Sequence, residues 1–360
     1  MLALTFLRIL VNIILLPRPW IKMKKDNITI QDVARHAGVS MMTVSRVMGK
    51  KTNVKETTRR KILAAIEQLQ YQPNVAARSL AGSRSYFLGL VYDNPNEAYL
   101  SQILMGALHK CTDRGYNLVI SSFERAADGS YKIDDALINR AKLDGVIIPP
   151  PLCDSPEILR RLTDADIPMV RIAPQTLPDY SAFVRMDDRR AAHEITEFLI
   201  NLGHRKIGFI TGHPDHGASK LRYEGMKKAL EDKGIPLRQD YIQQGYFSYK
   251  SGADCTENLL ELEDPPTAIF ASSDDMAAGA ISTVHRHGLS VPDDISVVGF
   301  DDVPLASAIW PGLTTIRQPI MAMAERAAEF LMYPDPEKEK DNILDYKLII
   351  RESAAPPHTS

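Results

Sequence analysis

One stretch of about twenty residues, from Ile28 to Met48, constrains the fold of this chain more than any other. It reads I-T-I-Q-D-V-A-R-H-A-G-V-S-M-M-T-V-S-R-V-M. Thr29 and Asp32 resemble a capping box, with Asp in place of the usual Glu or Gln. Apolar residues then recur at i, i+3, i+4 and i+7, which predicts a short helix with one buried stripe. These residues are Ile30, Val33, Ala34 and Ala37.

A second short helix is predicted directly after a tight turn. Gly38 permits the left-handed backbone that such a turn needs, and Ser40 can cap a helix that begins at Met41. Two helices joined this tightly make a helix-turn-helix, although the same spacing also suits a helical hairpin in an ordinary core. We expect Val44 and Val47 to face inward. If the partner is DNA, this helix lies in the major groove. The residues left to face that partner are Met41, Met42, Ser45 and Arg46.

The next segment and the charge distribution favour the helix-turn-helix. Glu56 to Leu69 reads as a third helix that closes a three-helix unit, with an apolar side made of Ile62, Ala65, Ile66 and Leu69. Residues 22–84 hold 13 Lys and Arg against 4 Asp and Glu, whereas the whole chain holds 43 against 45. This excess of positive charge in one part of the chain indicates a polyanionic partner.

These motifs resemble a known family. The pattern I-T-I-Q-D-V-A-R-H-A-G-V-S-x-x-T-V-S-R-V, followed by Y-Q-P-N-V-A-A-R-S-L-A-G from Tyr71 to Gly82, is similar to the DNA-binding headpiece and hinge of LacI/GalR transcription regulators. The resemblance covers nearly all of residues 28–351. It implies a homodimer or tetramer that binds a pseudo-palindromic double-stranded operator and responds to a small molecule. It also implies that Asn74 to Leu80 forms a hinge helix on the operator, with Leu80 wedged into the minor groove.

The resemblance also implies which residues contact DNA. Met41 and Met42 occupy the two positions that largely set base preference in the family, and Met has no hydrogen-bond donor. We therefore expect apolar contacts there, for instance to thymine methyls, and hydrogen bonds to bases or phosphates from neighbouring polar side chains. Gly49 stands where the family often has Asn. The full predicted set is Thr29, Ser40, Met41, Met42, Thr43, Ser45, Arg46, Asn53, Val54, Thr58, Asn74, Ala77 and Leu80.

Residues 1–22 do not fit this pattern. Leu2 to Leu16 is apolar but contains Arg8 and Asn12, and about fifteen residues is short of the roughly twenty that span a bilayer. No A-x-A-like cleavage site follows. An uncleaved anchor, a signal segment and an upstream start codon all remain open. We favour the start codon, because Met23-Lys24-Lys25 lies where family members begin.

Composition predicts a cytoplasmic protein without a membrane partner. The 360 residues, 44% hydrophobic and 24% charged, suffice for a small headpiece and a large core. The three cysteines are an odd number without paired spacing, so we expect reduced thiols.

From Tyr86 onward, strands alternate with helices, which predicts an α/β core of two Rossmann-like lobes. The expected strands are Leu88–Tyr92, Asn117–Ser121, Val146–Ile148, Met169–Ile172, Ile207–Thr211, Tyr241–Gln243, Ala268–Phe270 and Ser296–Phe300. The resemblance implies a periplasmic-binding-protein-like core whose chain crosses between lobes near Arg185, Gln318 and Asp341. The expected parts are a headpiece (27–72), a hinge helix and linker (73–84), a core (85–353) and a tail (354–360). One lobe would comprise 85–185 with 319–340, and the other 187–317 with 341–353.

Parallel sheets bind ligands beyond the carboxyl ends of their strands, and polar residues follow several of the predicted strands. Carboxylates and amides there suit a polyhydroxylated ligand, because each carboxylate can accept two hydroxyl hydrogen bonds. The resemblance adds Arg222 and Asp301 as effector contacts and Phe247 as a stacking ring. Asp and Asn are also common after strands simply as turn residues. The candidate effector-binding residues are Asp93, Asn94, Asp187, Arg222, Phe247, Asp274 and Asp301.

Enzyme motifs were not found. The chain has no G-x-x-x-x-G-K-[ST] phosphate loop and no G-x-S-x-G nucleophile elbow. His213, Asp215 and His216 could be imagined as metal ligands, but they lie in a predicted loop without a second ligand pair. We expect no catalysis, metal or cofactor. The sequence predicts a repressor controlled by a sugar or sugar derivative; the alternative is an exported periplasmic-type sugar-binding protein, which would have no use for a basic headpiece.

Overall fold

The computed structural model describes residues 28–48, 54–71, 84–94, 96–125, 131–132, 142–176, 180–334 and 342–358. The chain forms two units, Met1–Ser83 and Arg84–Ser360. We describe each unit by itself. Among the described residues, no helix combines the length and the apolar character needed to cross a bilayer.

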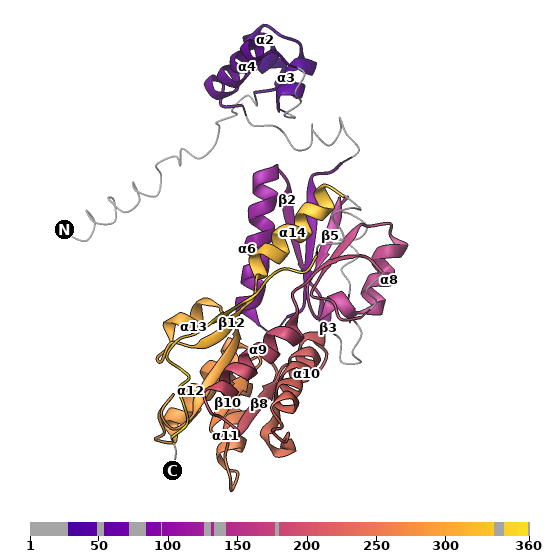
Figure 1. The fold of residues 1–360 in the computed structure, drawn as a ribbon. Helices are drawn as coiled ribbons and strands as arrows, with labels where there is room; N and C mark the ends of the chain where they lie inside the picture. The colour runs from indigo at the N-terminus through magenta and orange to yellow at the C-terminus, as the bar shows by residue number, and fades with distance from the viewer. Residues whose placement is uncertain are drawn as a thin grey trace, which may run out of the picture. The chain divides into compact units, whose positions relative to one another are not determined.

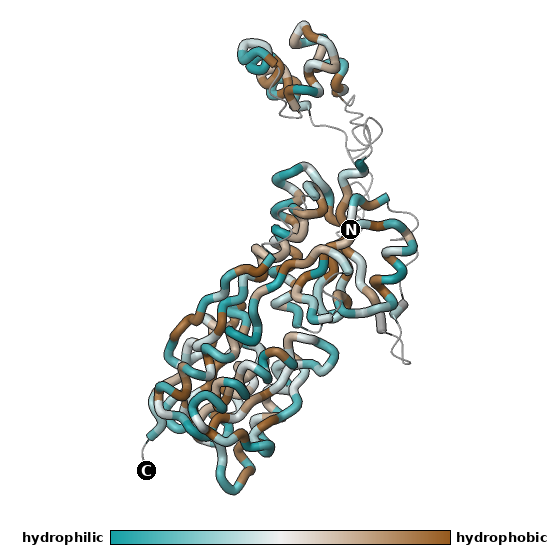
Figure 2. Tube along the Cα trace, turned by 45° about the vertical axis from the view of Figure 1, so that its right-hand side comes forward, coloured by the Kyte–Doolittle hydropathy of each residue, from teal (hydrophilic) through white to brown (hydrophobic). Residues whose placement is uncertain are grey.

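The first unit contains the predicted helix-turn-helix and a third helix. Its described helices are α2 (Ile30–Ala37), α3 (Met41–Met48) and α4 (Glu56–Gln68). Val33, Val44 and Ile62, one from each helix, are fully buried against one another. Hydrophobic and hydrophilic residues alternate around these helical turns, as the amphipathic pattern requires (Figure 2).

Local backbone chemistry fixes the ends of α2. The Thr29 amide donates to Asp32 Oδ2 at 2.9 Å, and the Asp32 amide donates to Thr29 Oγ1 at 3.3 Å, which confirms the predicted capping box. Gly38 ends the helix with φ 65°, the left-handed conformation expected of it. The Ser40 hydroxyl accepts from the amide of Thr43 at 3.3 Å and so caps the start of α3. Gly38 and the Ser40 cap together set the tight turn between the two helices.

The second unit contains two lobes, and the first lobe is built on a five-stranded parallel sheet. Its strand order is β2-β1-β5-β6-β7. The strands are β1 (Phe87–Tyr92), β2 (Asn117–Ser122), β5 (Gly145–Ile148), β6 (Met169–Ile172) and β7 (Ala182–Val184). Its helices are α6 (Glu97–Arg114), α8 (Pro156–Asp164) and α14 (Ile320–Met332), with a short turn η1 (Leu152–Asp154) and a small ladder of β3 (Glu124–Arg125) and β4 (Tyr131–Lys132).

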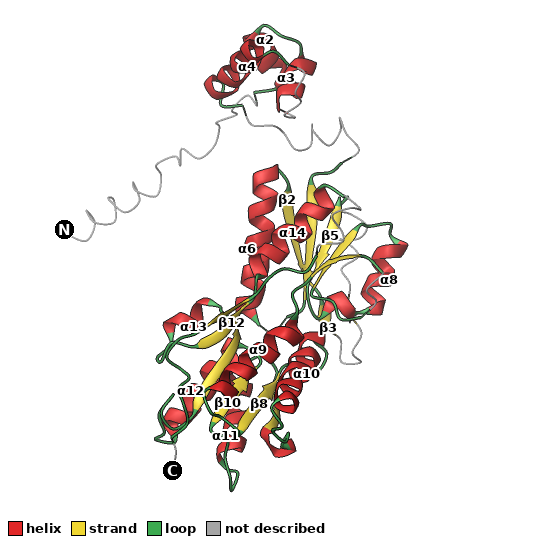
Figure 3. Ribbon diagram, viewed as in Figure 1, coloured by secondary structure: helices red, strands yellow, loops and turns green. Residues whose placement is uncertain are grey.

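The second lobe is built on a six-stranded sheet with the order β13-β12-β11-β10-β8-β9, in which only β13 is antiparallel. The strands are β8 (Ile207–Thr211), β9 (Ile242–Gln244), β10 (Ala268–Ala271), β11 (Ser296–Asp301), β12 (Thr314–Arg317) and β13 (Lys347–Ile349). The helices are α9 (Asp188–Asn201), α10 (Gly217–Asp232), α11 (Tyr249–Leu260), α12 (Asp274–Arg286) and α13 (Pro304–Ala308), with η2 (Gln239–Tyr241). Figure 3 shows helices beside both sheets.

Both lobes repeat one topology. Counted along the chain within each main sheet, the first five strands have the order 2-1-3-4-5. The central strands β5 and β10 are buried at every residue, as expected for parallel strands covered on both faces. In sheets of this order, ligands bind at the carboxyl edge beside the first strand, where the direction of winding reverses. The repeated topology confirms the predicted core of two Rossmann-like lobes.

Three connections join the lobes. The chain passes from β7 to α9, from β12 to α14, and from α14 to β13. Helix α14 packs against α6 and the first sheet although it follows a strand of the second sheet (Figure 1). An isolated bridge between Arg185 and Ile343 places two of these connections side by side.

Several element bounds differ from the prediction. Strand β1 begins at Phe87 rather than Leu88, and helix α6 begins at Glu97, where the Asn96 side chain accepts from the Tyr99 amide at 2.9 Å and caps it. Strand β9 begins at Ile242, since Tyr241 belongs to a 3-10 turn. The expected tail is in part packed, as the Ala355 amide donates to Ser296 Oγ at 3.0 Å. The predicted hinge helix lies outside the described residues.

Candidate functional site

The exposed face of α3 is the first candidate site. Val44 and Val47 are buried, whereas the side chains expected to face a partner are exposed. Met41 is 49% and Met42 64% exposed, which is unusual for large apolar side chains. Arg46 lies on the same face, with Nη2 3.5 Å from the Met42 sulfur. This face therefore offers apolar groups and one guanidinium to a partner.

The other residues predicted to contact DNA differ in their surroundings. The hydroxyls of Ser40 and Thr43 lie 2.9 Å apart. Thr29 Oγ1 donates to Asp32 Oδ2 at 2.7 Å, so this hydroxyl already serves the helix cap. Val54 packs against the core of the three-helix unit, and Thr58 is half-buried in the first turn of α4. Asn53, Asn74, Ala77 and Leu80 lie outside the described residues.

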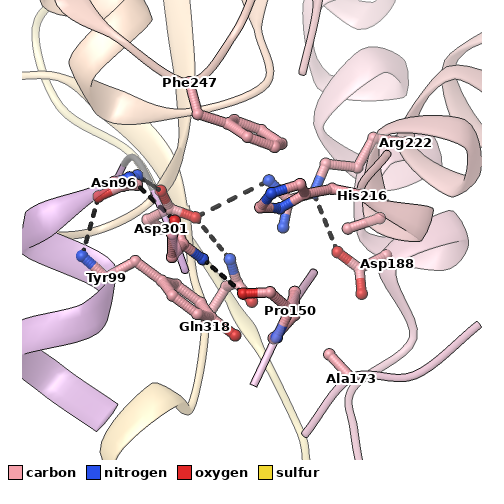
Figure 4. A pocket seen from close by; sticks show the side chains of 12 residues that line it. Asn96, Tyr99, Pro150, Ala173, Asp188, His216, Arg222, Phe247, Asp301 and Gln318 are labelled. Carbon is pink, nitrogen blue, oxygen red and sulfur yellow. Dashed lines mark hydrogen bonds and ion pairs between the residues drawn. The ribbon is translucent and has the colours of Figure 1, made fainter. Parts of the chain in front are cut away.

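The second candidate site is a cavity between the two lobes (Figure 4). Its lining comes mainly from residues that follow strands of both sheets, at the edge where parallel sheets bind ligands. The first lobe contributes Asn94, Asn96, Tyr99, Pro150 and Ala173, and the second lobe contributes Asp188, His216, Ala218, Arg222, Phe247 and Asp301, with Gln318 from a connection. The two lobes thus form one site together.

Arg222 projects from α10 into the centre of this cavity and is held on several sides. Its Nε donates to Asp188 Oδ1 at 2.9 Å, and Nη1 donates to the Ser272 carbonyl at 2.6 Å. The guanidinium carbon lies 3.7 Å from the ring centroid of Phe300, a cation–π contact. Asp301 Oδ1 is 3.8 Å from Nη1. The cation is therefore neutralised by protein groups before any ligand arrives.

Asp301 lies at the end of β11 and bonds to both lobes. Asn96 Nδ2 of the first lobe donates to its Oδ2 at 3.3 Å, and Gln318 Nε2 donates to its Oδ1. Burial raises the pKa of Asp301 to about 7, against the opposing effects of Arg222 and Gln318. This carboxyl group is consequently balanced between its charged and neutral forms near neutral pH.

An aromatic wall faces these polar groups. The ring of Phe247 lies 5.2 Å from the ring of His216, and His216 lies 5.3 Å from His213. Burial, assisted by the neighbouring His213 and Arg222, lowers the pKa of His216 to about 3, so this ring is neutral. Gly212 is required here, because an added Cβ would lie 1.9 Å from Phe247 Cζ. The wall offers flat apolar surface and one neutral imidazole.

The backbone of the cavity is strained at three of its lining residues. Ala173, Phe247 and Asp301 have φ of 49°, 57° and 123°, in the region that disfavours side chains. Such strain concentrates at functional sites, where the surrounding structure holds it in place.

The cavity includes four of the seven residues predicted to bind an effector, namely Asn94, Arg222, Phe247 and Asp301. Asp274 is fully buried and accepts from the Val303 amide at 2.9 Å and from Thr315 Oγ1 at 2.6 Å, so it braces the loop after β11. Asp187 caps α9 by accepting from the Arg190 amide at 3.0 Å. Asp93 is half-buried in the loop after β1. None of these three lines the cavity as the structure describes it.

Sequence reasoning missed Asp188, Asn96, Tyr99, His216 and Gln318. Asp188 directly follows the predicted Asp187, but it is the first residue of α9 and turns toward Arg222. Asn96 follows the first strand, so the rule that ligands bind beyond the carboxyl ends of parallel strands could have found it. Tyr99 and Gln318 carried no local signal.

The lobes are close together in this structure. The cavity has a volume of about 30 Å³. A Cβ on Gly217 of the second lobe would lie 2.0 Å from Gln175 Cγ of the first. Pockets for small molecules usually measure about 300–1,000 Å³, so a ligand of that size would fit only if the lobes separated or the lining side chains moved.

Comparison with known proteins covers both candidate sites. The family model described as bacterial regulatory proteins, lacI family, matches residues 29–74, and the periplasmic binding protein-like domain matches residues 196–354. Catabolite control protein A of Priestia megaterium is 33% identical over 91% of this chain and 99% of its own length. The transcriptional repressor PurR of Actinobacillus pleuropneumoniae is 35% identical over 84% of this chain and 90% of its own.

Solved structures give the same result. A complex of the transcriptional regulator CelR with cellobiose matches with a TM-score of 0.68 and 28% identity, covering 91% of this chain and all of CelR. The lac repressor dimer bound to operator and the anti-inducer ONPF matches with a TM-score of 0.68 and 28% identity, covering 91% of this chain and 99% of that one. With a helix-turn-helix unit, a two-lobed core and relatives aligned along both, this chain belongs to the LacI family of bacterial regulatory proteins, the ligand-modulated transcriptional repressors.

Proposed function

We propose that this chain is a homodimeric repressor that reads its operator with α3 and is controlled by an uncharged, polyhydroxylated molecule in the cavity between the lobes. On DNA, the exposed Met41 and Met42 would contact thymine methyls, and Arg46 would supply a hydrogen bond to a base or a phosphate. The positive charge of residues 22–84 would supply sequence-independent attraction to phosphates.

The charge balance of the cavity carries the proposed effector class. Among the described residues that line it, Arg222 is the one cationic side chain, and Asp188 and Ser272 already accept its hydrogen bonds. Two carboxyl groups, Asp188 and Asp301, accompany this single cation. A phosphate or carboxylate on a ligand would meet no free positive charge, whereas ligand hydroxyls would find carboxylate acceptors.

The aromatic wall supports a ring-shaped ligand. Phe247 and His216 offer flat surface against which the apolar face of a sugar ring can pack, and neutral His216 adds one donor and one acceptor. A relative of similar fold was solved with cellobiose, a neutral sugar of this chemical class.

Control would operate as a population shift. A ligand that binds one relative orientation of the lobes more tightly than another stabilises that orientation. Its effect on operator affinity is limited by this difference in binding free energy, and operator DNA must affect ligand affinity reciprocally.

A second copy of this chain would complete the operator-binding form. A groove of about 520 Å³ on the second lobe is lined by Tyr249, Ile281, His285, Leu305, Ile309 and Trp310, which we call the Trp310 surface. Trp310 is 80% exposed, the kind of aromatic that anchors protein interfaces. Two-fold operators require two reading helices, and the similar lac repressor was solved as a dimer.

Trp310→Glu should shift the sedimentation of the full chain toward the monomer. Unchanged sedimentation would exclude the Trp310 surface as the dimer interface.

One experiment tests the repressor and its effector class. Labelled DNA from upstream of the chain's own gene is titrated with the full protein, and anisotropy is recorded at several salt concentrations. We expect sequence-selective binding that weakens with salt, and a change in affinity with at least one neutral sugar from a panel of neutral sugars, sugar phosphates, uronates and nucleobases. A response to sugar phosphates or uronates alone would refute the effector class, and the absence of selective binding would refute the repressor.

The alternative of an exported sugar-binding protein leaves the first unit without a role. Relatives that are named repressors align with nearly the full length of this chain, helix-turn-helix included. We therefore do not retain that alternative.

A further inference from the structure

Helices α6 and α14 both begin at the same carboxyl group of the cavity. Asn96 caps α6, and its Nδ2 donates to Asp301 at 3.3 Å. Gln318 lies two residues before the first residue of α14, and its Nε2 donates to Asp301 as well. Any change at Asp301 therefore reaches the first turns of both helices.

The two helices run in the same general direction, and α14 packs against α6 at an angle (Figure 1). A Cβ on Gly106 of α6 would lie 2.3 Å from the Met321 carbonyl of α14, so the backbones are in close contact. Further along, His109 pairs with Glu325 at 2.8 Å and Lys110 with Glu329 at 3.4 Å. Such close packing couples the two helices, since packed interiors deform little.

Arg84 bonds to the last residue of α14 and to a residue just beyond the end of α6. Tyr116, two residues beyond the end of α6, accepts from Arg84 Nη1 at 3.0 Å through its hydroxyl. The same Nη1 donates to the carbonyl of Met332, the last residue of α14. A cation at helix C-termini is favoured by the helix dipole and satisfies carbonyls that lack partners within the helix.

The residues after Arg84 are held elsewhere. The amides of Ser85 and Tyr86 donate to the carboxylate of Asp144 at 2.7 Å and 3.0 Å, and Asp144 lies just before β5 of the first sheet. Arg84 is thus bonded to the end of α14 and to Tyr116, which lies between α6 and β2, whereas its neighbours are bonded to Asp144 before β5. A shift of the end of α14 relative to Asp144 would turn the backbone at Arg84.

Arg84 is also the first residue of the second unit, directly after Ser83 of the first. We infer that Arg84 is a positioning residue that transmits the state of the cavity, through the α6–α14 pair, to the segment leading into the DNA-binding unit. Helix α6 has 18 residues and carries this coupling over about 27 Å, at 1.5 Å per residue. This inference rests on the proposed function, because it assigns a route for the regulation of operator binding.

A double-mutant cycle on operator affinity tests the route without requiring the effector. Asn96→Ser keeps a side chain that can cap α6 but is too short to reach Asp301, so it perturbs the cavity end. Arg84→Met removes the hydrogen bonds at the other end. The probe is labelled DNA from upstream of the chain's own gene, and the cycle separates coupling from any direct effect of Arg84 on DNA. Arg160→Met, at an exposed arginine of α8, is the matched control.

We expect Asn96→Ser to change the operator Kd by about fivefold or more in the native background, within the usual range of allosteric coupling. In the Arg84→Met background the same substitution should change Kd by less than about twofold, and in the Arg160→Met background by the native factor. Arg84→Lys should restore part of the coupling, because an ammonium can still donate to the Met332 carbonyl. Tyr116→Phe, which keeps the ring, should reduce the coupling without removing it.

Two results would overturn the inference. One is an equal effect of Asn96→Ser with and without Arg84; the other is no effect of Asn96→Ser on the native protein. If Arg84→Met fails to give a native circular dichroism spectrum, Arg84→Lys and Tyr116→Phe carry the same comparison. A native protein that binds no promoter fragment selectively would instead refute the proposed function, which makes the two failures distinguishable.

Discussion

Removing Asp188 should destabilise the second unit strongly, because it leaves Arg222 buried without its closest counter-ion. The side chains of Asp188 and Arg222 are 1% and 6% exposed, and their 2.9 Å bond is shielded from water. Breaking a buried pair from one side costs about 3–5 kcal/mol. Arg222 keeps the Ser272 carbonyl and the ring of Phe300, so we expect a loss near the lower end, about 3 kcal/mol, for Asp188→Ala.

The size of this loss should depend on pH through Asp301. The charge of Asp188 is among the causes that raise the pKa of Asp301 to about 7. Without Asp188, the pKa of Asp301 should fall, so Asp301 ionises more readily and replaces the missing counter-ion of Arg222. Between the ordinary pKa of 3.8 and about pH 7, the native protein keeps the proton of Asp301 whereas the unfolded chain has lost it, so native stability falls as the pH rises. A lower folded pKa in the variant narrows this window, so the variant loses less stability over the same range. The destabilisation caused by Asp188→Ala should therefore be larger near pH 6 than near pH 8.

Urea unfolding followed by far-ultraviolet circular dichroism measures these differences. Asp188→Asn keeps an oxygen that can accept from Arg222 and should cost less than Asp188→Ala. The control is Asp164→Asn, which breaks the exposed pair with Arg160 at 2.8 Å and should cost less than about 0.5 kcal/mol. If Asp188→Ala costs no more than this control, the buried pair does not stabilise the fold as argued.

Two further predictions concern the reading helix and the cavity. Arg46→Ala should weaken operator binding sharply, whereas Met41→Ala should mainly change base preference. Footprints and titrations of both variants on one promoter fragment would measure these effects. Unchanged affinity for Arg46→Ala would contradict the assignment. Asp301 has a folded pKa of about 7 against an ordinary value of 3.8, so its contribution lowers stability as pH rises through this window. Asp301→Asn should remove that decline, which melting temperatures near pH 5 and pH 8 would reveal; an equal decline in both proteins would contradict it.

The three-helix unit could be predicted in detail because its signals are local. The capping box of Thr29 and Asp32, the left-handed Gly38 and the inward Val44 and Val47 each follow from residues within a few positions of one another. Helix periodicity and capping act over one or two turns, so a sequence read in short windows contains them.

The cavity could be predicted only in part because its geometry is set over long distances in sequence. The rule that ligand groups follow parallel strands located the correct edge of each sheet, and Asn94 and Asp301 line the cavity there. The rule gives no side-chain direction, so it does not distinguish Asp187, a helix cap, from its neighbour Asp188, which faces Arg222. Gln318 reaches the cavity only because the chain returns from β12 to α14, a crossing that periodicity does not reveal.

The bonds of Asp301 suggest how the proposed effector would affect both lobes. Its carboxyl group accepts from Asn96 of the first lobe and from Gln318 of a connection, and it lies 3.8 Å from Arg222 of the second lobe. A carboxylate has about four acceptor sites, so sites remain for ligand hydroxyls beside Asn96 and Gln318. A ligand hydroxyl bonded there would lie among groups of both lobes, so the strength of its bonds would depend on how the lobes are oriented. That dependence is the differential affinity that any shift in lobe orientation requires.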